Sequence, residues 1–424
     1  MDVKVGSAKQ IRGSLRTAGD KSISHRYAML AGIAEGTSEF ENFSSSADCA
    51  STLACMEALG ARVRRTGNHV EVDGVGGALL APAQALDCGN SGSTMRMLSG
   101  VLASQPFTSA MTGDASLSKR PMRRVIDPLC QMGAEIESHG GCAPLTIHGA
   151  KLEAMEYQPP VASAQVKSCV LLAGLFTQGV TTVIEPVRTR DHTELALKAF
   201  GAEVIRDGDR VSVRGGQKLH AIKAYVPGDL SSVTFFLCAA ALFPGASLVV
   251  DSVLLNPTRS VVLDVLSGMG VKINFLKVEE QYGELIGTMQ VEGGVFQGGV
   301  IRGWQSAALI DELPAIAAVA PYSVQGVEIR DAAELRVKEC DRIAAVVRNL
   351  RAMGAEVEEF PDGMRIPGGQ HLHGAAVESF DDHRIAMAFA IAGLRAKGET
   401  TIKGAEAVAV SFPEFFEALQ KVVE

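Results

Sequence analysis

The sequence predicts a mixed α/β protein built from repeated units, and three observations support this fold class. The 424 residues include 44 glycines but only 5% aromatic residues, which is typical of many short elements joined by tight turns. Five segments share the pattern of an amphipathic helix, a capping glycine and an alternating strand. Their glycines are Gly60, Gly133, Gly201, Gly270 and Gly354. In a second recurring pattern, a helix ends at a glycine turn that leads into a short strand.

Each predicted unit contains a helix, a strand, a second helix and a hairpin. The glycine-turn strands lie in residues 35–43, 178–186, 244–252, 325–331 and 397–404. A sixth helix of the amphipathic kind, FFEALQKVVE, ends the chain. We therefore expect six units of about 70 residues each.

Six units of this size favour two compact lobes of three units over a continuous solenoid, whose repeats are usually shorter. We place the lobe boundary near Val226-Pro-Gly-Asp229 and assign the first strand to the later lobe. The predicted lobes are residues 1–18 with 228–424, and residues 19–227, so the chain would cross between them twice.

Composition excludes several classes of protein. The net charge of −8 disfavours nucleic-acid binding. The longest apolar run, Phe235–Phe243, is too short to span a membrane, and the N-terminal residues do not resemble a signal peptide. The eight cysteines include no C-x-x-C pair, so neither a zinc site nor a disulfide framework is indicated. We expect a soluble cytoplasmic protein with reduced thiols.

Positive side chains gather where five helices are predicted to begin. The segments are Arg16–Arg26, Gly89–Arg96, Gly113–Arg124, Glu334–Arg342 and Asp381–Phe389. Each segment has an ordinary alternative: solvated charges, an N-cap at Ser93 or Thr94, or an exposed ion pair between Glu339 and Arg342. The helix dipole disfavours cations at N-termini, and local rules tend to be broken at functional sites. We interpret the five segments together as a site between the lobes that holds more than one phosphate or carboxylate.

Two carboxylates accompany these cations. Asp311 lies between two apolar runs, and Glu339 lies three residues before Arg342. A module that only binds anions has no use for carboxylates in its site, whereas an enzyme needs groups that transfer protons. Their presence therefore favours an enzyme, with Asp311 and Glu339 as the proton-transfer groups.

Seven motifs in order link the chain to a known family. They are G-D-K-S-x-S-x-R (19–26), G-N-S-G-S-T-x-R (89–96), L-x-K-R-P-M (117–122), A-S-A-Q-x-K-S (162–168), R-D-H-T-E (190–194), R-V-K-E-x-D-R (336–342) and D-D-H-R-x-A-M (381–387). On these motifs the chain resembles the enolpyruvyl transferases over essentially its whole length. The resemblance implies a two-lobed inside-out α/β barrel, in which each lobe has three βαβαββ repeats and the lobes close on the substrates.

The resemblance is greatest to the branch that transfers the enolpyruvyl group of phosphoenolpyruvate to the 5-hydroxyl of shikimate 3-phosphate and releases phosphate. That reaction belongs to the shikimate pathway to chorismate and aromatic amino acids. The resemblance implies no metal or organic cofactor, in agreement with the absence of metal-ligand spacing. We expect a monomer that acts on these two small molecules, without a nucleic-acid or membrane partner.

Matched motif by motif, the resemblance also implies which residues act. It implies proton transfer by Lys21, Asp311 and Glu339. It implies phosphoenolpyruvate binding by Lys21, Asn90, Gly92, Arg120, Lys338, Arg342, His383 and Arg384. It implies shikimate 3-phosphate binding by Lys21, Ser22, Arg26, Ser163, Ala164, Gln165, Arg190, Asp311 and Lys338.

Some positions depart from the pattern of relatives. Ala164 stands where some relatives have a second serine, and Val410 stands where some have a lysine that contacts phosphoenolpyruvate. In relatives Gly92 lines the phosphoenolpyruvate pocket, which the herbicide glyphosate also occupies. Thr94 replaces the alanine of some relatives beside it.

Two alternative functions stay open. The sister branch uses UDP-N-acetylglucosamine as acceptor, but it carries a loop cysteine where this chain has Ala115, and it prefers Lys-Asn where this chain has Lys21-Ser22. The other alternative is a non-catalytic polyanion-binding homologue, which the intact Lys21, Asp311, Glu339 and Arg342 disfavour.

Overall fold

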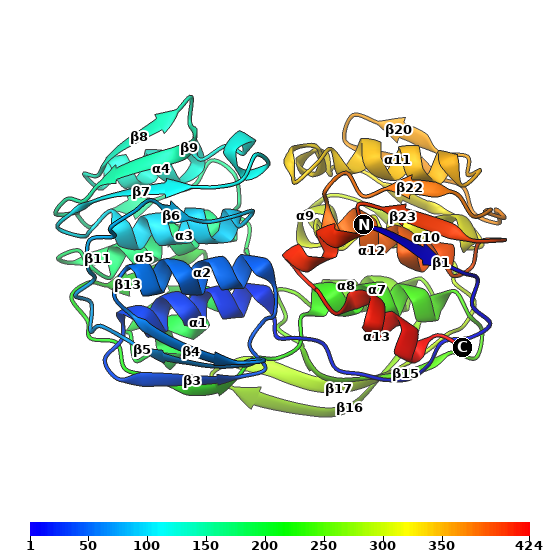
Figure 1. Ribbon diagram of the computed structural model, residues 1–424, viewed down its shortest axis with the longest axis horizontal. Helices are drawn as coiled ribbons and strands as arrows, with labels where there is room; N and C mark the ends of the chain where they lie inside the picture. The colour runs from blue at the N-terminus through cyan, green and yellow to red at the C-terminus, as the bar shows by residue number, and fades with distance from the viewer. The chain divides into compact units, whose positions relative to one another are not determined.

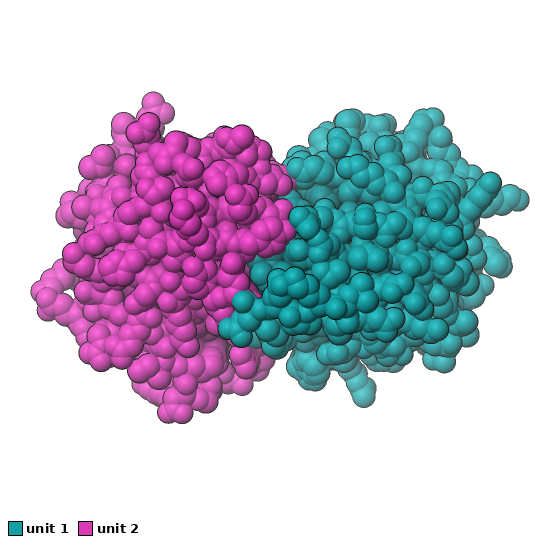
Figure 2. Space-filling view, turned by 90° about the horizontal axis from the view of Figure 1, so that it is seen from below, with its two compact units in different colours: residues 1–18, 227–280, 285–424 teal, residues 19–226, 281–284 magenta.

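The computed structural model describes residues 1–424, which form two compact units (Figure 1). Unit 1 consists of residues 1–18, 227–280 and 285–424, and unit 2 of residues 19–226 and 281–284, as coloured in Figure 2. The prediction put Pro227 in the other lobe and did not anticipate that residues 281–284 join unit 2. Those four residues form the turn of a hairpin, and Gln281 accepts a hydrogen bond from the backbone of Tyr225 in unit 2 at 2.8 Å.

Unit 2 contains three four-stranded sheets of one design. In each sheet the first two strands are parallel and the others are antiparallel to their neighbours. The first sheet has the order β14 (Lys223–Tyr225), β3 (Thr37–Glu41), β5 (His69–Asp73), β4 (Arg62–Thr66). The second has the order β6 (Leu86–Asp87), β7 (Thr108–Thr112), β9 (Cys142–His148), β8 (Glu135–His139). The third has the order β10 (Glu156–Tyr157), β11 (Val180–Ile184), β13 (Arg210–Arg214), β12 (Val204–Asp207).

Unit 1 repeats this design with one difference. Its first sheet has the order β16 (Lys272–Gln281), β17 (Glu284–Glu292), β15 (Ser247–Leu254), β2 (Arg12–Leu15). Its second has the order β18 (Gly299–Ile301), β19 (Val327–Ile329), β21 (Gly363–Ile366), β20 (Glu358–Phe360). Its third has only the three strands β22 (Ala376–Glu378), β23 (Thr400–Lys403) and β1 (Asp2–Val5). The antiparallel partner of β23 is therefore the first strand of the chain, with Asp2 opposite Lys403.

The parallel edge strand in the first sheet of each unit comes from the segment just before the chain crosses to the other unit. Strand β2 precedes the first helix of unit 2 in the sequence but pairs in parallel with β15 of unit 1. Strand β14 precedes the first long helix of unit 1 but pairs in parallel with β3 of unit 2. The crossings after Ala18 and after Val226 thus each follow a strand that pairs within the unit that the chain is leaving.

Each unit has three central helices. In unit 2 they are α1 (Lys21–Ile33), α3 (Gly92–Leu102) and α5 (Ala164–Gly174), and in unit 1 they are α7 (Leu230–Ala241), α10 (Leu313–Val319) and α12 (His383–Gly393). Every residue of α7, α10 and α12 is buried, as are most residues of the other three. Helices that are apolar on all sides must be surrounded by protein, so they form the cores around which the sheets pack (Figure 1).

Close packing within unit 2 depends on glycine at one point. Helix α3 packs against α5, and a Cβ at Gly100 would overlap the carbonyl oxygen of Cys169. Only glycine allows the two backbones to approach this closely.

Outer helices follow the strands in each repeat. They are α2 (Ala47–Ala58), α4 (Arg123–Gln131), α6 (His192–Ala199), α8 (Val261–Gly268), α11 (Arg342–Ala352) and α13 (Phe415–Val422). The short elements are α9 (Trp304–Ala308), η1 (Leu117–Lys119), η2 (Ala320–Tyr322), η3 (Ala333–Val337) and η4 (Ala405–Val410). None of the helices has the length and apolar character that a membrane crossing requires.

The five predicted capping glycines are confirmed. Gly60, Gly133, Gly201, Gly270 and Gly354 follow α2, α4, α6, α8 and α11, and their φ angles lie between 88° and 105°. This left-handed conformation strains any residue with a Cβ, which explains why glycine recurs there. The predicted mixed α/β class and its helix, glycine and strand pattern are both present in the structure.

Candidate active site

The predicted site residues gather at the N-terminal ends of helices. Unit 2 contributes Lys21, Ser22, Arg26, Asn90, Gly92, Arg120, Ser163, Ala164, Gln165 and Arg190, and unit 1 contributes Asp311, Lys338, Glu339, Arg342, His383 and Arg384. Most of them belong to, or directly precede, a central helix. Backbone N–H groups at such ends have no partner within the helix and attract anions.

Lys21 is the first residue of α1. Asp20 caps the helix by accepting a hydrogen bond from the backbone N–H of Ile23. The Lys21 ammonium lies 2.9 Å from the carboxylate of Asp48 on α2, and 17% of the lysine side chain is exposed. The lysine is therefore held in place by a nearly buried acid and can still reach a ligand.

Arg26 lies one turn further along α1 and is buried. Its guanidinium donates hydrogen bonds to the hydroxyls of Thr193 and Ser168, at 2.6 and 2.8 Å, and to the carbonyl oxygen of Ser22 at 2.8 Å. Its pKa is lowered to about 10, mainly by burial and in part by the nearby charge of Arg190, while acidic neighbours oppose the shift. Arg26 is thus still charged at neutral pH, and it joins α1, α5 and α6.

Arg120 and Asn90 form the second cluster of unit 2. The Arg120 guanidinium donates to the side-chain oxygen of Asn90 at 2.8 Å and to its backbone carbonyl at 3.3 Å. The amide of Asn90 in turn donates to Asp114 at 2.8 Å. These contacts fix the loop before α4 against the start of α3.

Gln165 joins this cluster to α5. Its side-chain oxygen accepts a hydrogen bond from Arg96 at 2.8 Å, and its amide donates to the hydroxyl of Ser93 at 2.9 Å. Ser163 caps α5, and Ala164 is the first residue of that helix. Arg190 is half-buried in the segment before α6.

Gly92 is the first residue of α3. The helix is capped by Ser91, so the alternative of an N-cap at Ser93 or Thr94 is wrong. A Cβ at Gly92 would lie 2.9 Å from a terminal nitrogen of Arg96 and 3.5 Å from one of Arg120. Because glycine has no Cβ, the guanidinium groups of Arg96 and Arg120 can approach the first turn of α3.

The cluster of unit 1 is centred on Arg342, whose side chain is only 1% exposed. Its Nε donates to Asp382 at 2.7 Å, one terminal nitrogen donates to Glu339 at 2.6 Å, and the other lies 3.6 Å from Asp311. The three carboxylates together raise its pKa against the opposing effect of burial. Asp311 and Glu339 keep 20% and 17% of their side chains exposed, whereas Asp382 has none, so only the first two can reach a substrate.

Two more cations, Arg384 and Lys338, and the side chain of His383 complete the unit 1 cluster. Arg384 donates to the carbonyl oxygen of Asp311 at 2.7 Å, and its guanidinium lies 3.7 Å from the Asp311 carboxylate. His383 is the first residue of α12 and is buried. Lys338 lies 3.9 Å from Glu334, and desolvation lowers the pKa of its ammonium, with Arg342 adding to the shift and nearby acids opposing it.

Comparison with known proteins shows the family of the chain. A family model described as EPSP synthase (3-phosphoshikimate 1-carboxyvinyltransferase) matches residues 5–419. The chain belongs to this family. A 3-phosphoshikimate 1-carboxyvinyltransferase of Koribacter versatilis is 63% identical over 423 residues, covering 100% of this chain and 99% of the relative. One of Solibacter usitatus is 54% identical, with 100% of both chains covered.

Solved structures of the EPSP synthase family share the fold. A structure of EPSP synthase from Acinetobacter baumannii superimposes with a TM-score of 0.89 at 42% identity, covering 100% of this chain and 98% of that one. A second structure from the same organism gives a TM-score of 0.88 at 41% identity. The mixed α/β fold of this chain is therefore that of the EPSP synthases.

The cation pattern at helix starts is present in this member of the family, with one correction. Glu339 and Arg342 do not share a helix, because α11 begins at Arg342 with Asp341 as its cap. Glu339 lies in the loop after η3, which carries its carboxylate to the guanidinium without helical spacing. The ion pair is therefore present, but the side chains of Arg342 and Glu339 are only 1% and 17% exposed, so the alternative of an exposed pair is wrong.

Several side chains of the clusters were not predicted. They are Asp48, Arg96, Asp114, Ser168, Thr193 and Asp382. Arg96, Ser168, Thr193 and Asp382 belong to the recurring family motifs, so the motifs themselves were the available signal. Asp48 and Asp114 follow no local pattern, since their contacts depend on how distant segments pack.

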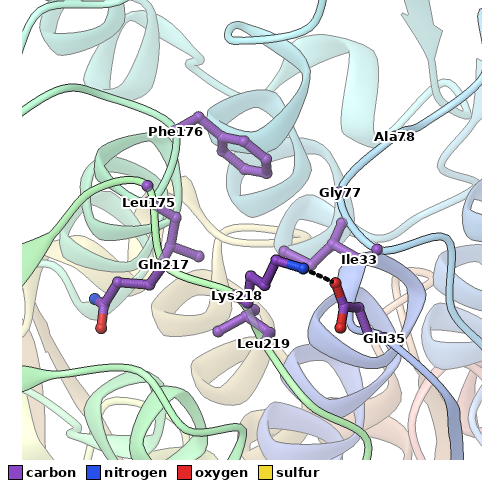
Figure 3. Close-up of a pocket in the computed structure, with 11 residues that line it drawn as sticks. Ile33, Glu35, Gly77, Ala78, Leu175, Phe176, Gln217, Lys218 and Leu219 are labelled. Atoms are coloured by element: carbon purple, nitrogen blue, oxygen red, sulfur yellow. Dashed lines mark hydrogen bonds and ion pairs between the residues drawn. The ribbon is translucent and has the colours of Figure 1, made fainter.

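A pocket of about 400 Å³ in unit 2 lies apart from these residues (Figure 3). Ile33 and Leu175 line it at the C-terminal ends of α1 and α5, and Lys218 forms an ion pair with Glu35 at 2.7 Å beside it. Lys21 lies at the opposite end of α1, which at 1.5 Å per residue is about 20 Å away. No group of three or more His, Cys, Asp or Glu side chains is arranged to hold a metal ion.

Proposed function

We propose that this protein transfers the enolpyruvyl group of phosphoenolpyruvate to the 5-hydroxyl of shikimate 3-phosphate and releases inorganic phosphate. This reaction leads to chorismate and the aromatic amino acids. The observation that supports it most is the Arg342 cluster, in which two partly exposed carboxylates accompany buried cations in a chain of the EPSP synthase family. An anion-binding protein without catalytic activity would gain nothing from those carboxylates.

Unit 2 would bind shikimate 3-phosphate. The 3-phosphate would meet the starts of α1 and α5, where Ser22, Ser163, Ala164, Gln165 and the N-terminal amides of α5 are available. Arg26 would act mainly by orienting this surface, since its three hydrogen bonds already join α1, α5 and α6. Arg190 would contribute a further positive charge.

Phosphoenolpyruvate carries a carboxylate and a phosphate, and both need cations. We assign the binding of both groups to Lys21, Asn90, Gly92 and Arg120 of unit 2, and to Lys338, Arg342, His383 and Arg384 of unit 1. Guanidinium groups bind planar and tetrahedral anions through paired hydrogen bonds, which suits Arg120, Arg342 and Arg384 to this role.

The chemistry requires three proton transfers. The 5-hydroxyl of shikimate 3-phosphate loses a proton as its oxygen attacks C2 of phosphoenolpyruvate, and the methylene carbon C3 gains one, which gives a tetrahedral intermediate. Loss of phosphate and of a proton from the same methyl carbon then regenerates the double bond. We assign these transfers to Lys21, Asp311 and Glu339, each held by an ion pair and each partly exposed.

We also propose that the two units form the two lobes of an inside-out α/β barrel and close on the substrates bound between them. Two cation-rich surfaces repel each other until anions neutralise them, so shikimate 3-phosphate should favour a closed form. Small-angle scattering should then show a smaller radius of gyration at saturating shikimate 3-phosphate. An unchanged radius would contradict closure.

We propose that the protein is a cytoplasmic monomer. Light scattering should then give a mass near that of one 44.6 kDa chain, with and without substrates. A mass of twice that value would contradict this proposal.

The reaction itself is tested by phosphate release. Wild-type protein with phosphoenolpyruvate and shikimate 3-phosphate together should release one phosphate per enolpyruvyl product, and neither substrate alone should give phosphate. The Asp311→Asn variant, which keeps the size of the side chain, is the matched control and should lose about 10²–10⁴-fold in turnover. Phosphate release that does not depend on shikimate 3-phosphate would overturn the proposal.

A further inference from the structure

Helices α1 and α2 meet along a seam with two polar contacts. Lys21 and His25 lie four residues apart on α1, and Asp48 and Thr52 lie four residues apart on α2, so each pair is on one helix face. The outer contact is the ion pair between Lys21 and Asp48. The inner contact joins Nδ1 of His25 to the hydroxyl of Thr52 at 2.6 Å, and both residues are completely buried.

The inner contact continues into α3. The Thr52 hydroxyl lies 2.6 Å from the hydroxyl of Thr94, and Thr94 donates to the hydroxyl oxygen of Ser91 at 2.7 Å. Ser91 also accepts from the backbone N–H of Thr94 at 3.1 Å, as the cap of α3. Four buried side chains from three helices therefore form one continuous hydrogen-bonded chain.

The direction of this chain follows from its last member. Because Thr94 donates its hydroxyl proton to Ser91, Thr94 must accept from Thr52, and Thr52 must accept from an N–H on Nδ1 of His25. His25 then carries its proton on Nδ1, while its buried Nε2 has no hydrogen-bond partner. Burial, together with the charges of Lys21 and Arg26, lowers the pKa of His25 well below its usual value, which keeps the ring neutral as this arrangement requires.

The chain ends where the proposed phosphoenolpyruvate site begins. Ser91 lies between Asn90 and Gly92, and the backbone N–H of Gly92 donates to the carbonyl oxygen of Asn90 at 3.0 Å. The two accepted bonds occupy the lone pairs of the Ser91 oxygen and fix the rotamer of the cap. The cap in turn fixes the first turn of α3, whose N–H groups lie beside Arg120 in the proposed phosphoenolpyruvate site.

We propose that His25, Thr52 and Thr94 are positioning residues that hold the first turn of α3 in place for phosphoenolpyruvate, an inference that rests on the proposed function. They do not touch the substrate, because all three are fully buried. Hydrogen bonds in a buried chain polarise one another, so the chain stiffens the turn more than separate bonds would.

The test removes the middle hydroxyl. Thr52→Val keeps the shape of the side chain but breaks the chain, and Thr52→Ser restores a hydroxyl at the same place. Thr234→Val is the matched control, since Thr234 is also fully buried in a helix but its hydroxyl donates only to Leu230 of the same helix. Thr94→Ala breaks the chain at its next member and serves if Thr52→Val does not fold.

Two measurements are needed for each variant. The first is the steady-state KM for each substrate, and the second is hydrogen exchange of the backbone amides in residues 91–96 of the ligand-free protein. We expect Thr52→Val to raise the KM for phosphoenolpyruvate about 3- to 10-fold, the usual effect of losing one buried hydrogen bond, with the KM for shikimate 3-phosphate within about twofold of wild type. Exchange in residues 91–96 should become about tenfold faster, and Thr52→Ser should restore both values.

Three outcomes would overturn the inference. They are exchange in residues 91–96 that matches wild type, equal changes in both KM values, and an effect no larger than that of Thr234→Val. If wild-type protein fails to use phosphoenolpyruvate, the proposed function is wrong and so is the role of the chain in binding it. The exchange data would in that case still show whether the chain stiffens α3.

Discussion

Replacing Glu339 with glutamine separates a proton-transfer role from a structural one. The change keeps the size of the side chain and its hydrogen-bonding oxygen but removes the negative charge. Glu339 accepts a hydrogen bond from Arg342 at 2.6 Å, and Arg342 has two further carboxylate neighbours, Asp382 at 2.7 Å and Asp311 at 3.6 Å. The guanidinium therefore stays paired in the variant, and the protein should fold.

The size of the effect follows from these contacts. If Glu339 only supports Arg342, the variant loses one charge-assisted hydrogen bond, about 1.5–3 kcal/mol, and the loss appears as weaker phosphoenolpyruvate binding. If Glu339 transfers a proton, kcat itself falls about 10²–10⁴-fold. We expect the second result, with the KM for phosphoenolpyruvate changed by less than about tenfold.

The assay is steady-state phosphate release with each substrate varied, supported by single-turnover measurements that isolate the chemical step. Asp382→Asn is the matched control because it makes the same chemical change in another carboxylate of Arg342, one that is fully buried and cannot meet substrate. We expect that control to lower the melting temperature and to raise the KM for phosphoenolpyruvate. If Glu339→Gln behaves like the control, with kcat within about tenfold of wild type, Glu339 is a structural partner and the assignment is wrong.

Three further changes test other parts of the account. In Gly92→Ala the new methyl would displace the Arg96 guanidinium that binds Gln165, and overpacking of this kind costs about 1–3 kcal/mol. Because glyphosate is the longer ligand, its inhibition constant should rise more than the KM for phosphoenolpyruvate. An equal rise in both constants would count against the argument. Arg26→Lys cannot keep all three hydrogen bonds of the guanidinium. The KM for shikimate 3-phosphate should therefore rise about tenfold or more, while the KM for phosphoenolpyruvate stays near wild type. If both KM values are unchanged, Arg26 does not belong to the site. Because the pKa of His25 is lowered in the folded protein, its contribution to stability is present above pH 6.5 and is lost as the pH falls below that value, by up to about 1.4 kcal/mol per pH unit. Denaturation at pH 7.5 and 5.5 should therefore show that the free energy of unfolding falls less in His25→Asn than in wild type. An equal fall in both proteins would contradict the burial argument.

Local features of the fold could be predicted because they depend on nearby residues. The glycines after α2, α4, α6, α8 and α11 adopt the positive φ that ends a helix, and the apolar stripes before them set the helices. Long-range pairing could not be predicted in the same way. Strand β1 completes a sheet with β23 some 400 residues later, and β2 and β14 pair outside their own repeats. Such pairings depend on backbone hydrogen bonds between distant segments, which no local pattern encodes.

In the candidate site, too, the residues with a local sequence signal could be predicted, and their partners from distant segments could not. The rule that cations avoid helix N-termini was broken at five helices, and that signal led to Lys21, Arg120, Arg342 and Arg384, and to His383 beside Arg384, from the sequence. The partners that hold these cations were harder to find. Asp48 is on a different helix from Lys21 and has no motif of its own, and the chain from His25 to Ser91 exists only because three helices pack side by side.

The choice of acceptor tests the central claim most directly. Phosphate release from phosphoenolpyruvate should be measured with shikimate 3-phosphate and, separately, with UDP-N-acetylglucosamine, using the same wild-type protein. The account predicts turnover with shikimate 3-phosphate and none above background with UDP-N-acetylglucosamine, in keeping with Ala115 at the position where the sister branch has its loop cysteine. Turnover with UDP-N-acetylglucosamine alone, or with neither acceptor, would contradict it.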